Sequence, residues 1–240
     1  MEKIWAVVPA AGIGKRMGMA VKKQFIRLKG KEILIRTLQT LAEVPEIEGI
    51  LLMVSRDDLD LCQHLIHDHH IEKVKDILPG GSTRQESVLK GLSAIPKDCT
   101  MAVIHDGARP LVTRQQIKET IEAARKHGGA LLAVPVKDTI KVANKKGFAV
   151  QTPPRSNLWS AQTPQAFRYP DILNAHRHAM VMGDYACTDD SQIVEKYLDL
   201  PVKIVQGSYE NIKITTPEDI SIGERILEAR AAQNDGGAKA

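Results

Sequence analysis

The sequence predicts an α/β fold in which a Rossmann-like, mostly parallel, twisted sheet is flanked by helices and carries a protruding β-hairpin arm. Short β-branched runs alternate with helical patterns along the chain, as they do in βαβ units. The runs are apolar nearly throughout, which is typical of strands that helices cover on both faces. One later segment breaks the alternation and reads as two short strands around a turn.

The expected strands and helices follow one another in order along the chain. The clearest strands cover residues 4–8, 49–55, 101–105 and 131–136. The expected helices cover residues 33–42, 57–67, 83–93, 113–127, 171–182, 189–197 and 217–230. Several helices begin with a capping signal: Ser82 and Thr113 each offer a hydroxyl, and Thr216 is followed by a first-turn proline and two acids.

The segment 138–152 is the one that interrupts this alternation, with its turn at residues 144–147. No linker composition, internal repeat or low-complexity tract accompanies it. We therefore expect a single domain over residues 1–232, which includes the hairpin arm at about 138–152, and a disordered polar tail over residues 233–240. An arm of this kind often packs on a partner subunit.

Composition and charge exclude several classes of protein. With 240 residues, 43% of them hydrophobic and 26% charged, the chain is expected to be globular. No apolar run approaches the roughly 18 residues of a membrane span, and no signal peptide is recognisable. The 33 basic residues are scattered among 29 acidic ones, which favours a small anionic ligand over a nucleic acid. Three widely spaced cysteines predict neither disulfides nor a metal site, so a cytoplasmic location is expected.

A run of small residues follows the first predicted strand, at the sheet edge where open α/β proteins bind ligands. It reads PAAGIGKRMG over residues 9–18, and two more lysines, Lys22 and Lys23, come shortly after it. Backbone amides in this loop could approach a phosphate, and the cations could neutralise a polyphosphate. The glycine spacing matches neither GxGxxG nor GxxxxGK[ST], and the second strand ends at Ser55 without an acid for a ribose. A tight turn with a solvated basic face stays the alternative.

Two further segments carry residues suited to phosphate chemistry. Asp106 and Arg109 follow the strand at 101–105, where a carboxylate could hold a Mg²⁺ ion ligated mainly by substrate phosphate oxygens. A salt bridge between these two side chains within a turn is the plain alternative. Residues 79–87 form a second glycine-rich approach to a helix, in which Arg84 and Ser87 share one face and could hold a phosphate or a base edge.

Other segments read as structural by pattern alone. The stretch 155–165 is too rich in proline for a central strand, so we expect it at an edge or in a loop. Residues 188–190 are expected to cap the next helix, and Lys213 is expected to point outward from an alternating strand at 211–215. The histidines at 64, 67, 69 and 70 lack ligating partners at metal-site spacing, and no GxSxG motif supports a serine hydrolase.

Considered together, these motifs resemble the 2-C-methyl-D-erythritol 4-phosphate cytidylyltransferase family of the non-mevalonate isoprenoid pathway, over almost the whole chain. The matching motifs, in chain order, are PAAGIGKRM at 9–17, Lys23-Gln24, Arg84 with Ser87-Val88, HDGARP at 105–110, PVKDTIK at 135–141, Arg155 with LWSAQTPQ at 158–165, TDD at 188–190 and NIKIT at 211–215.

The resemblance implies a homodimeric, Mg²⁺-dependent enzyme that joins CTP to methylerythritol phosphate and releases pyrophosphate. It implies that Arg16 and Lys23 stabilise the transition state and that the acceptor is positioned by Arg155, Lys213, Thr139, Arg109 and Thr188. The expected nucleotide site comprises Pro9, Ala10, Ala11, Gly12, Gly14, Gly81, Arg84, Ser87 and Asp106, with Asp106 also as the metal ligand. Because family members swap the arm across the dimer, Thr139 and Arg155 are expected to serve the neighbour's site.

Two residues depart from the family pattern. Lys22 stands where a proline usually precedes Lys-Gln and is expected to loosen the loop, and Gly107 replaces the alanine of HDAARP and adds backbone freedom. Relatives that charge pentitol or pentulose phosphates with CTP share the loop and the TPQ segment, whereas PAAG and DTIK favour methylerythritol phosphate. A non-catalytic nucleotide-binding regulator on the same fold is the other alternative, against which the catalytic cations argue.

Overall fold

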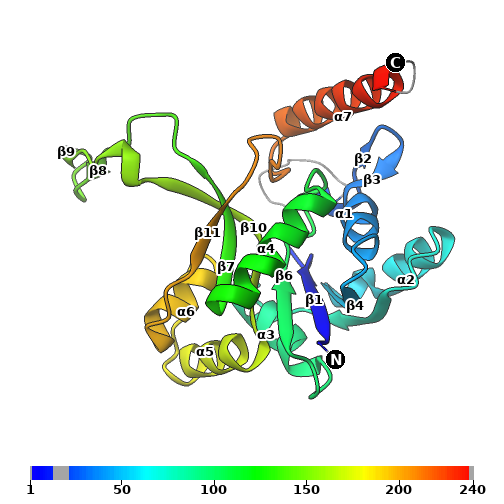
Figure 1. Cartoon of the computed structure of the whole chain (residues 1–240), viewed down its shortest axis with the longest axis horizontal. Coiled ribbons are helices and arrows are strands. Elements are labelled where there is room, and N and C mark those ends of the chain that lie inside the picture. The colour runs from blue at the N-terminus through cyan, green and yellow to red at the C-terminus, as the bar shows by residue number, and fades with distance from the viewer. Residues whose placement is uncertain (1, 13–21, 238–240) are drawn as a thin grey trace.

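The computed structural model describes residues 2–12 and 22–237 of the chain. Seven of the described strands form one sheet in the order β11-β7-β10-β6-β1-β4-β5 (Figure 1). All neighbouring pairs are parallel except the two that involve β10. The strands are β1 (Ile4–Pro9), β4 (Ile47–Val54), β5 (Val74–Pro79), β6 (Met101–Ile104), β7 (Gly129–Pro135), β10 (Trp159–Arg168) and β11 (Lys203–Gln206). The predicted α/β fold with a mostly parallel sheet is confirmed.

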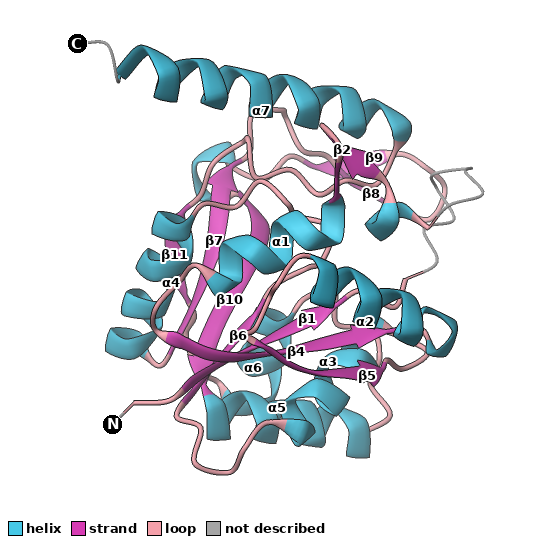
Figure 2. Cartoon of the chain, turned by 90° about the vertical axis from the view of Figure 1, so that its right-hand side faces the viewer, coloured by secondary structure: helices cyan, strands magenta, loops and turns pink. Residues whose placement is uncertain are grey.

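Helices cover both faces of the sheet, as the nearly uniform apolar strands predict (Figure 2). One face packs against α1 (Ile33–Ala42), α2 (Leu59–Asp68) and α4 (Arg114–His127), and the other against α3 (Arg84–Ala94), α5 (Tyr169–Val181) and α6 (Asp190–Leu198). In β1, Ala6 and Val8 belong to the first core and Val7 to the second. Burial of a larger aliphatic side chain, such as that of Val7 or Val8, contributes about 1.5–3 kcal/mol, so the sheet is the rigid frame of the molecule.

The helix starts follow from side-chain capping. Thr113 caps α4 in a reciprocal capping box with Gln116, and Thr83 caps α3 by accepting a hydrogen bond from the Glu86 amide at 3.0 Å. Asp189 caps α6 by accepting from the Gln192 amide at 2.9 Å. These caps confirm the expected starts to within one residue. They matter for the site because α3 and α6 both begin beside it.

The expectation that the stretch 155–165 lies at an edge or in a loop is wrong for residues 159–165. They belong to β10, which runs through the sheet between β7 and β6. The pairing of β10 with β7 shifts register between Ala161 and Gln165, and its pairing with β6 starts only at Gln165. Pro164 therefore lies in an irregular section of the strand, where a missing N–H donor disturbs no regular ladder pair.

Four peripheral segments also differ from the sequence prediction. The edge strands β5 and β11 were not expected, and the strand expected at 211–215 is wrong, because that segment has no regular secondary structure. Helix α7 (Pro217–Gly237) continues past the expected end at residue 230 and includes residues 233–237, which the sequence assigns to a disordered tail. Residues 238–240 lie outside the described part of the chain.

The predicted hairpin is present and extends away from the helical layers, on the opposite side of the molecule from α7 (Figure 1). Its strands are β8 (Val142–Ala143) and β9 (Ala149–Gln151), and the turn is closed by the Asn144 amide donating to the Phe148 carbonyl at 3.0 Å. Gly147 has a φ of +83°, a conformation that favours glycine. None of the helices in the described ranges has both the length and the hydropathy required to cross a membrane.

Helix α7 is attached to the body by a small apolar cluster of its own. Ile220 and Leu227 of α7 pack against Leu28, Ile33 and Ile214, close to the short strands β2 (Arg27–Leu28) and β3 (Lys31–Glu32). Burial of Ile214 anchors the segment at 211–215, which carries Lys213 on the way from β11 to α7. The apolar residues of this segment alternate because they anchor an irregular connection, and not because they form a strand.

Candidate active site

A cavity of about 180 Å³ lies at the carboxyl ends of β1 and β6, beside the start of α3. Ligands of open α/β sheets bind at this edge. The cavity is lined by every described member of the expected nucleotide site, namely Pro9, Ala10, Ala11, Gly12, Gly81, Arg84, Ser87 and Asp106. Lys23 and Lys213 also line it. Two expected residues, Gly14 and Arg16, lie outside the described residues. We call this space the first cavity.

Close backbone approaches build the walls of the first cavity. A Cβ atom on Gly80 would lie 2.6 Å from the Cβ of Ala11, so only glycine lets the turn before α3 approach the loop after β1 this closely. The Ser87 hydroxyl then fixes that turn, because it accepts from the Gly81 amide at 2.9 Å and donates to the Thr83 carbonyl at 2.8 Å. The small residues predicted from the sequence therefore shape the cavity.

Gly107 is held in place, contrary to the expectation that it adds backbone freedom. Its amide donates to the Pro9 carbonyl at 3.2 Å, and its carbonyl accepts from the Thr37 hydroxyl at 3.1 Å. An added Cβ would lie 3.0 Å from that of Ala10. The glycine therefore allows a close approach between the loops after β1 and β6.

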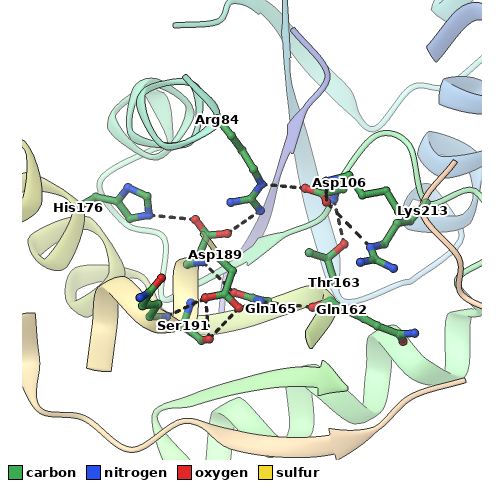
Figure 3. A network of polar contacts seen from close by, with 12 residues as sticks. Arg84, Asp106, Gln162, Thr163, Gln165, His176, Asp189, Ser191 and Lys213 are labelled. Atoms are coloured by element: carbon green, nitrogen blue, oxygen red, sulfur yellow. Dashed lines mark hydrogen bonds and ion pairs between the residues drawn. The ribbon is translucent and has the colours of Figure 1, made fainter. Parts of the chain in front are cut away.

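A buried carboxylate forms the centre of the site. Asp106 Oδ1 accepts from Arg84 Nε at 2.9 Å, Oδ2 pairs with Lys213 Nζ at 2.7 Å, and Arg109 Nε lies 4.0 Å from Oδ2 (Figure 3). Burial opposes ionisation of this carboxyl, but the Coulombic attraction of Arg84 and Lys213 outweighs it and holds the pKa of Asp106 well below its usual range. The predicted turn contact with Arg109 is therefore only the weakest of three ion pairs.

His105 supports the loop that carries this carboxylate. The ring is buried, and its Nε2 donates to the Arg109 carbonyl at 3.1 Å. Burial lowers the pKa of His105 to about 4, so the ring is neutral at pH 7. A neutral ring at this place closes the turn from Asp106 to Arg109 without adding a fourth cation.

A second cavity of about 250 Å³ adjoins the first and shares Arg84, Asp106 and Lys213 with it. Three of the residues expected at the acceptor, Lys213, Arg109 and Thr188, line this second cavity. The ion cluster around Asp106 is thus a common wall between two spaces. Such an arrangement can bring together two anionic ligands whose reacting groups meet at one cationic boundary.

Comparison with known proteins identifies the family. A family model described as 2-C-methyl-D-erythritol 4-phosphate cytidylyltransferase matches residues 4–229. A relative of that name from Desulforamulus reducens is 52% identical over 96% of this chain and 98% of its own length. Another from Pelotomaculum thermopropionicum is 46% identical over 96% of both chains. This chain belongs to the 2-C-methyl-D-erythritol 4-phosphate cytidylyltransferase family.

Solved structures agree with this assignment to the cytidylyltransferase family. The crystal structure of 4-diphosphocytidyl-2C-methyl-D-erythritolsynthase from Anaerococcus prevotii superposes with a TM-score of 0.83 at 33% identity, over 95% of this chain and 96% of that one. The Francisella tularensis 2-C-methyl-D-erythritol 4-phosphate cytidylyltransferase gives 0.78 at 29% identity, over 92% of this chain and 98% of that one. The similarity thus extends over nearly the whole chain.

Two residues expected at the cytidylyltransferase site do not reach it within one chain. Thr139 and Arg155 lie at the base of the arm, and neither lines the first or the second cavity. Arg155 begins a short 3-10 helix, η4 (Arg155–Asn157), where its guanidinium donates to the Lys137 carbonyl at 2.8 Å. Lys213, Arg109 and Thr188 thus line the second cavity together, whereas Thr139 and Arg155 of the same chain lie outside both cavities.

Lys22, which departs from the cytidylyltransferase pattern, is anchored. Its Nζ lies 2.8 Å from both carboxylate oxygens of Asp58 and 2.8 Å from the Ser55 hydroxyl. Asp58 is buried at the end of the 3-10 helix η3 (Arg56–Asp58). The Lys22 side chain therefore ties this segment to the end of β4. The preceding loop, which Lys22 was expected to loosen, falls at residues 13–21 and lies outside the described residues.

Sequence reasoning missed the polar floor of the second cavity, which β10 supplies. Gln165 accepts from the amides of Asp190 and Ser191 through Oε1, at 3.1 and 2.9 Å, and donates to Asp189 through Nε2 at 3.0 Å (Figure 3). Gln162 and Thr163 line the same cavity. The available signal was three polar side chains within a strand that continues into Ala166 and Phe167, but the adjacent proline suggested a connector instead.

Proposed function

We propose that this chain transfers the cytidylyl group of CTP to 2-C-methyl-D-erythritol 4-phosphate, giving 4-diphosphocytidyl-2-C-methyl-D-erythritol and pyrophosphate. The observation that carries the proposal is the wall of Arg84, Asp106 and Lys213 that two adjoining cavities share. CTP would enter the first cavity, and the sugar phosphate would enter the second. The new phosphorus–oxygen bond would then form where the two spaces meet. Membership of the cytidylyltransferase family supports this reading.

The reaction needs alignment and charge neutralisation more than proton transfer. The acceptor phosphate oxygen is already anionic at neutral pH, so it attacks the α-phosphorus of CTP without a general base. The buried histidine of the site, His105, agrees with this. Its ring is neutral, and its Nε2 already donates a hydrogen bond to the Arg109 carbonyl. The bond to the departing pyrophosphate breaks as the new bond forms, and negative charge grows on the oxygens around phosphorus and on the leaving group.

The chain's cations would stabilise that charge. Lys23 lines the first cavity, where the triphosphate would lie, and Arg16 is assigned the same role from the sequence alone. Lys213 and Arg109 line the second cavity and would orient the acceptor phosphate, with Thr188 beside them. The Lys213 side chain is about one third exposed, so its ammonium group can turn from Asp106 toward an incoming phosphate.

The residues present fit a Mg²⁺ ion that arrives with the nucleotide. Asp106 lines the first cavity, and its lowered pKa keeps the carboxylate ionised. No group of three or more His, Cys, Asp or Glu side chains within the described ranges could hold a metal alone. Mg²⁺ typically binds one or two carboxylates together with substrate phosphate oxygens, so Asp106 would supply the protein ligand. When bound, the ion neutralises and orients the triphosphate.

The arm suits a homodimer. Phe148 and Val150 are 68% and 61% exposed, and Ile140 and Val142 are also exposed, on a two-stranded hairpin that separates from the helical layers (Figure 1). A lone hairpin with this much exposed apolar surface is marginal in water and gains stability by packing on another surface. Docking on a second copy would bring Thr139 and Arg155 of one subunit to the acceptor site of the other.

Pyrophosphate release tests the proposed activity. The purified protein should release pyrophosphate only when CTP, Mg²⁺ and methylerythritol phosphate are all present. Matched reactions with ribitol 5-phosphate and ribulose 5-phosphate should stay at background. Release with either pentose derivative in place of methylerythritol phosphate would contradict the proposed acceptor. Binding of CTP without release under every condition would instead indicate a regulator.

A further inference from the structure

A buried polar chain extends from the shared wall to the helices behind it. Arg84 Nη2 donates to Asp190 Oδ2 at 2.8 Å, and His176 Nε2 lies 3.1 Å from Asp190 Oδ1 (Figure 3). Asp190 and His176 are both 0% exposed, and neither lines the first or second cavity. Asp190 and His176 are thus fully buried ionisable groups that take no direct part in the proposed reaction.

The protonation of this chain follows from its partners. Burial opposes ionisation of Asp190, but Arg84 and His176 outweigh it and lower the pKa of this carboxyl, so Asp190 is an acceptor. His176 Nε2 must therefore carry the proton and donate it. Each carboxylate oxygen of Asp190 then receives a donor, one from the guanidinium and one from the imidazole.

The geometry fixes the orientation of the guanidinium. Nε of Arg84 donates to Asp106 while Nη2 donates to Asp190, so one planar group bridges the loop after β6 and the start of α6. The arginine side chain has several rotatable bonds, and two directed contacts remove that freedom. Asp190 is fixed in turn, because its own amide donates to Gln165 and its carboxylate accepts from His176.

We propose that Asp190 and His176 are positioning residues that hold Arg84 against Asp106 and so maintain the wall between the two cavities. This inference rests on the proposed function. Without the donor on His176, Asp190 Oδ1 would be buried and unsatisfied, which is costly for a carboxylate. The guanidinium would turn to satisfy both oxygens of Asp190, as bidentate arginine does. Arg84 would then leave Asp106, whose remaining charge would bind Lys213 more tightly.

Substitutions at His176 that differ in one donor test this proposal. Leucine and glutamine have similar volumes, but only the glutamine amide can donate to Asp190. We expect His176→Leu to lower kcat/KM for CTP about tenfold or more, the usual effect of losing a partner behind a site residue. His176→Gln should retain roughly a third or more of the wild-type value. His178→Leu, on the exposed side of the same helix, is the control.

A measurement that needs no turnover separates this inference from the proposed function. In ¹⁵N-arginine-labelled protein, the Arg84 Nε–H resonance, assigned through Arg84→Lys, should exchange slowly with water in the wild type and in His176→Gln. It should exchange faster in His176→Leu. This result can be obtained even if methylerythritol phosphate proves not to be the acceptor.

The opposite outcomes are equally specific. If His176→Leu and His176→Gln give the same kcat/KM and the same Arg84 Nε–H exchange, His176 only joins α5 to α6 and the proposal is overturned. If His176→Leu does not fold, Asp190→Asn decides, because it keeps the shape and removes the charge that attracts Arg84. Unchanged exchange of the Arg84 Nε–H in Asp190→Asn would also overturn the proposal.

Discussion

Three cations stabilise the ionised form of the buried Asp106 carboxylate. Arg84 and Lys213 contact it directly, and Arg109 lies at the edge of ion-pair distance. If the negative charge of Asp106 is removed, Arg84, Lys213 and Arg109 face one another around a neutral side chain. The cluster is therefore both a ligand site and a source of stability, and its pH dependence follows from the lowered pKa of Asp106.

We expect Asp106→Asn to lower the free energy of unfolding by about 2 kcal/mol at pH 7. The pKa of Asp106 in the folded protein lies below the unfolded value of about 3.9, so its ionised form adds stability above about pH 4. That contribution disappears as the pH falls through the lower, folded pKa. Urea unfolding of both proteins between pH 7 and pH 3 should show the gap narrowing below about pH 4. A gap that stays constant with pH would contradict this.

At Lys22, an ion pair with Asp58 takes the place of the backbone constraint that a proline would impose. The family usually has proline before Lys-Gln, and the backbone of Lys22, with φ −62° and ψ 137°, is already in a region that proline adopts. The side chain meanwhile neutralises the buried Asp58. The two solutions restrain the same segment next to Lys23 by different means.

For this reason Lys22→Pro should keep turnover within about threefold of wild type while lowering the free energy of unfolding by about 1–3 kcal/mol, because Asp58 loses its cation. Addition of Asp58→Asn should recover part of that stability. Chemical denaturation and steady-state kinetics of the single and double variants check both statements. If the double variant is no more stable than Lys22→Pro, the ion pair has no stabilising role.

Among single residues, those within a recognisable motif were the most predictable. The glycines and alanines of the first cavity, Arg84, Ser87 and Asp106 were assigned from spacing and motif, and they line one space. Asp190 and His176 were not assigned to the site, because their contacts join residues far apart in sequence. A histidine inside a helical pattern gives no sign that its ring meets a carboxylate from the next helix.

Helices and strands were predicted correctly where the local sequence determines them, and less well where long-range contacts do. Helix α1 was predicted to the residue, because its apolar spacing is a local signal. β10 was misread, because its proline excludes a regular strand but not a strand with a register shift. The edge strands β5 and β11 mix polar and exposed residues, so their sequences lack the apolar run of a buried strand.

The hairpin arm exposes large apolar side chains that we expect to pack on a second subunit. We expect the double variant Phe148→Asp/Val150→Asp to sediment as a monomer, because two buried apolar contacts worth roughly 1.5–3 kcal/mol each are replaced by charges. Its melting temperature should change little, since both side chains are exposed within one chain. Lys146→Asp, in the turn of the same hairpin, is the charge control. Persistence of a dimer in the double variant would show that the arm is not the interface.

At the level of the whole molecule, the residues expected at the active site fall into two groups that lie in different places. Lys23, Lys213 and Arg109 border the cavities of their own chain, whereas Thr139 and Arg155 lie at the base of the arm and border neither. The resemblance to the family implies that Thr139 and Arg155 serve the neighbouring subunit, whereas composition and periodicity gave no sign of such a division. That division depends on how two copies dock, which no local pattern encodes.

Mixed dimers test the division directly. Lys23→Ala and Arg155→Ala should each lose about two to three orders of magnitude in turnover as pure dimers, the usual effect of removing one group that stabilises developing charge. In a dimer with one subunit of each kind, purified through two different tags, one site receives Lys23 from its own chain and Arg155 from the other. That site is intact, so the mixed dimer should show about half of the wild-type activity. If Arg155 instead served its own chain, both sites would carry one defect and pyrophosphate release would stay as low as in the pure variants.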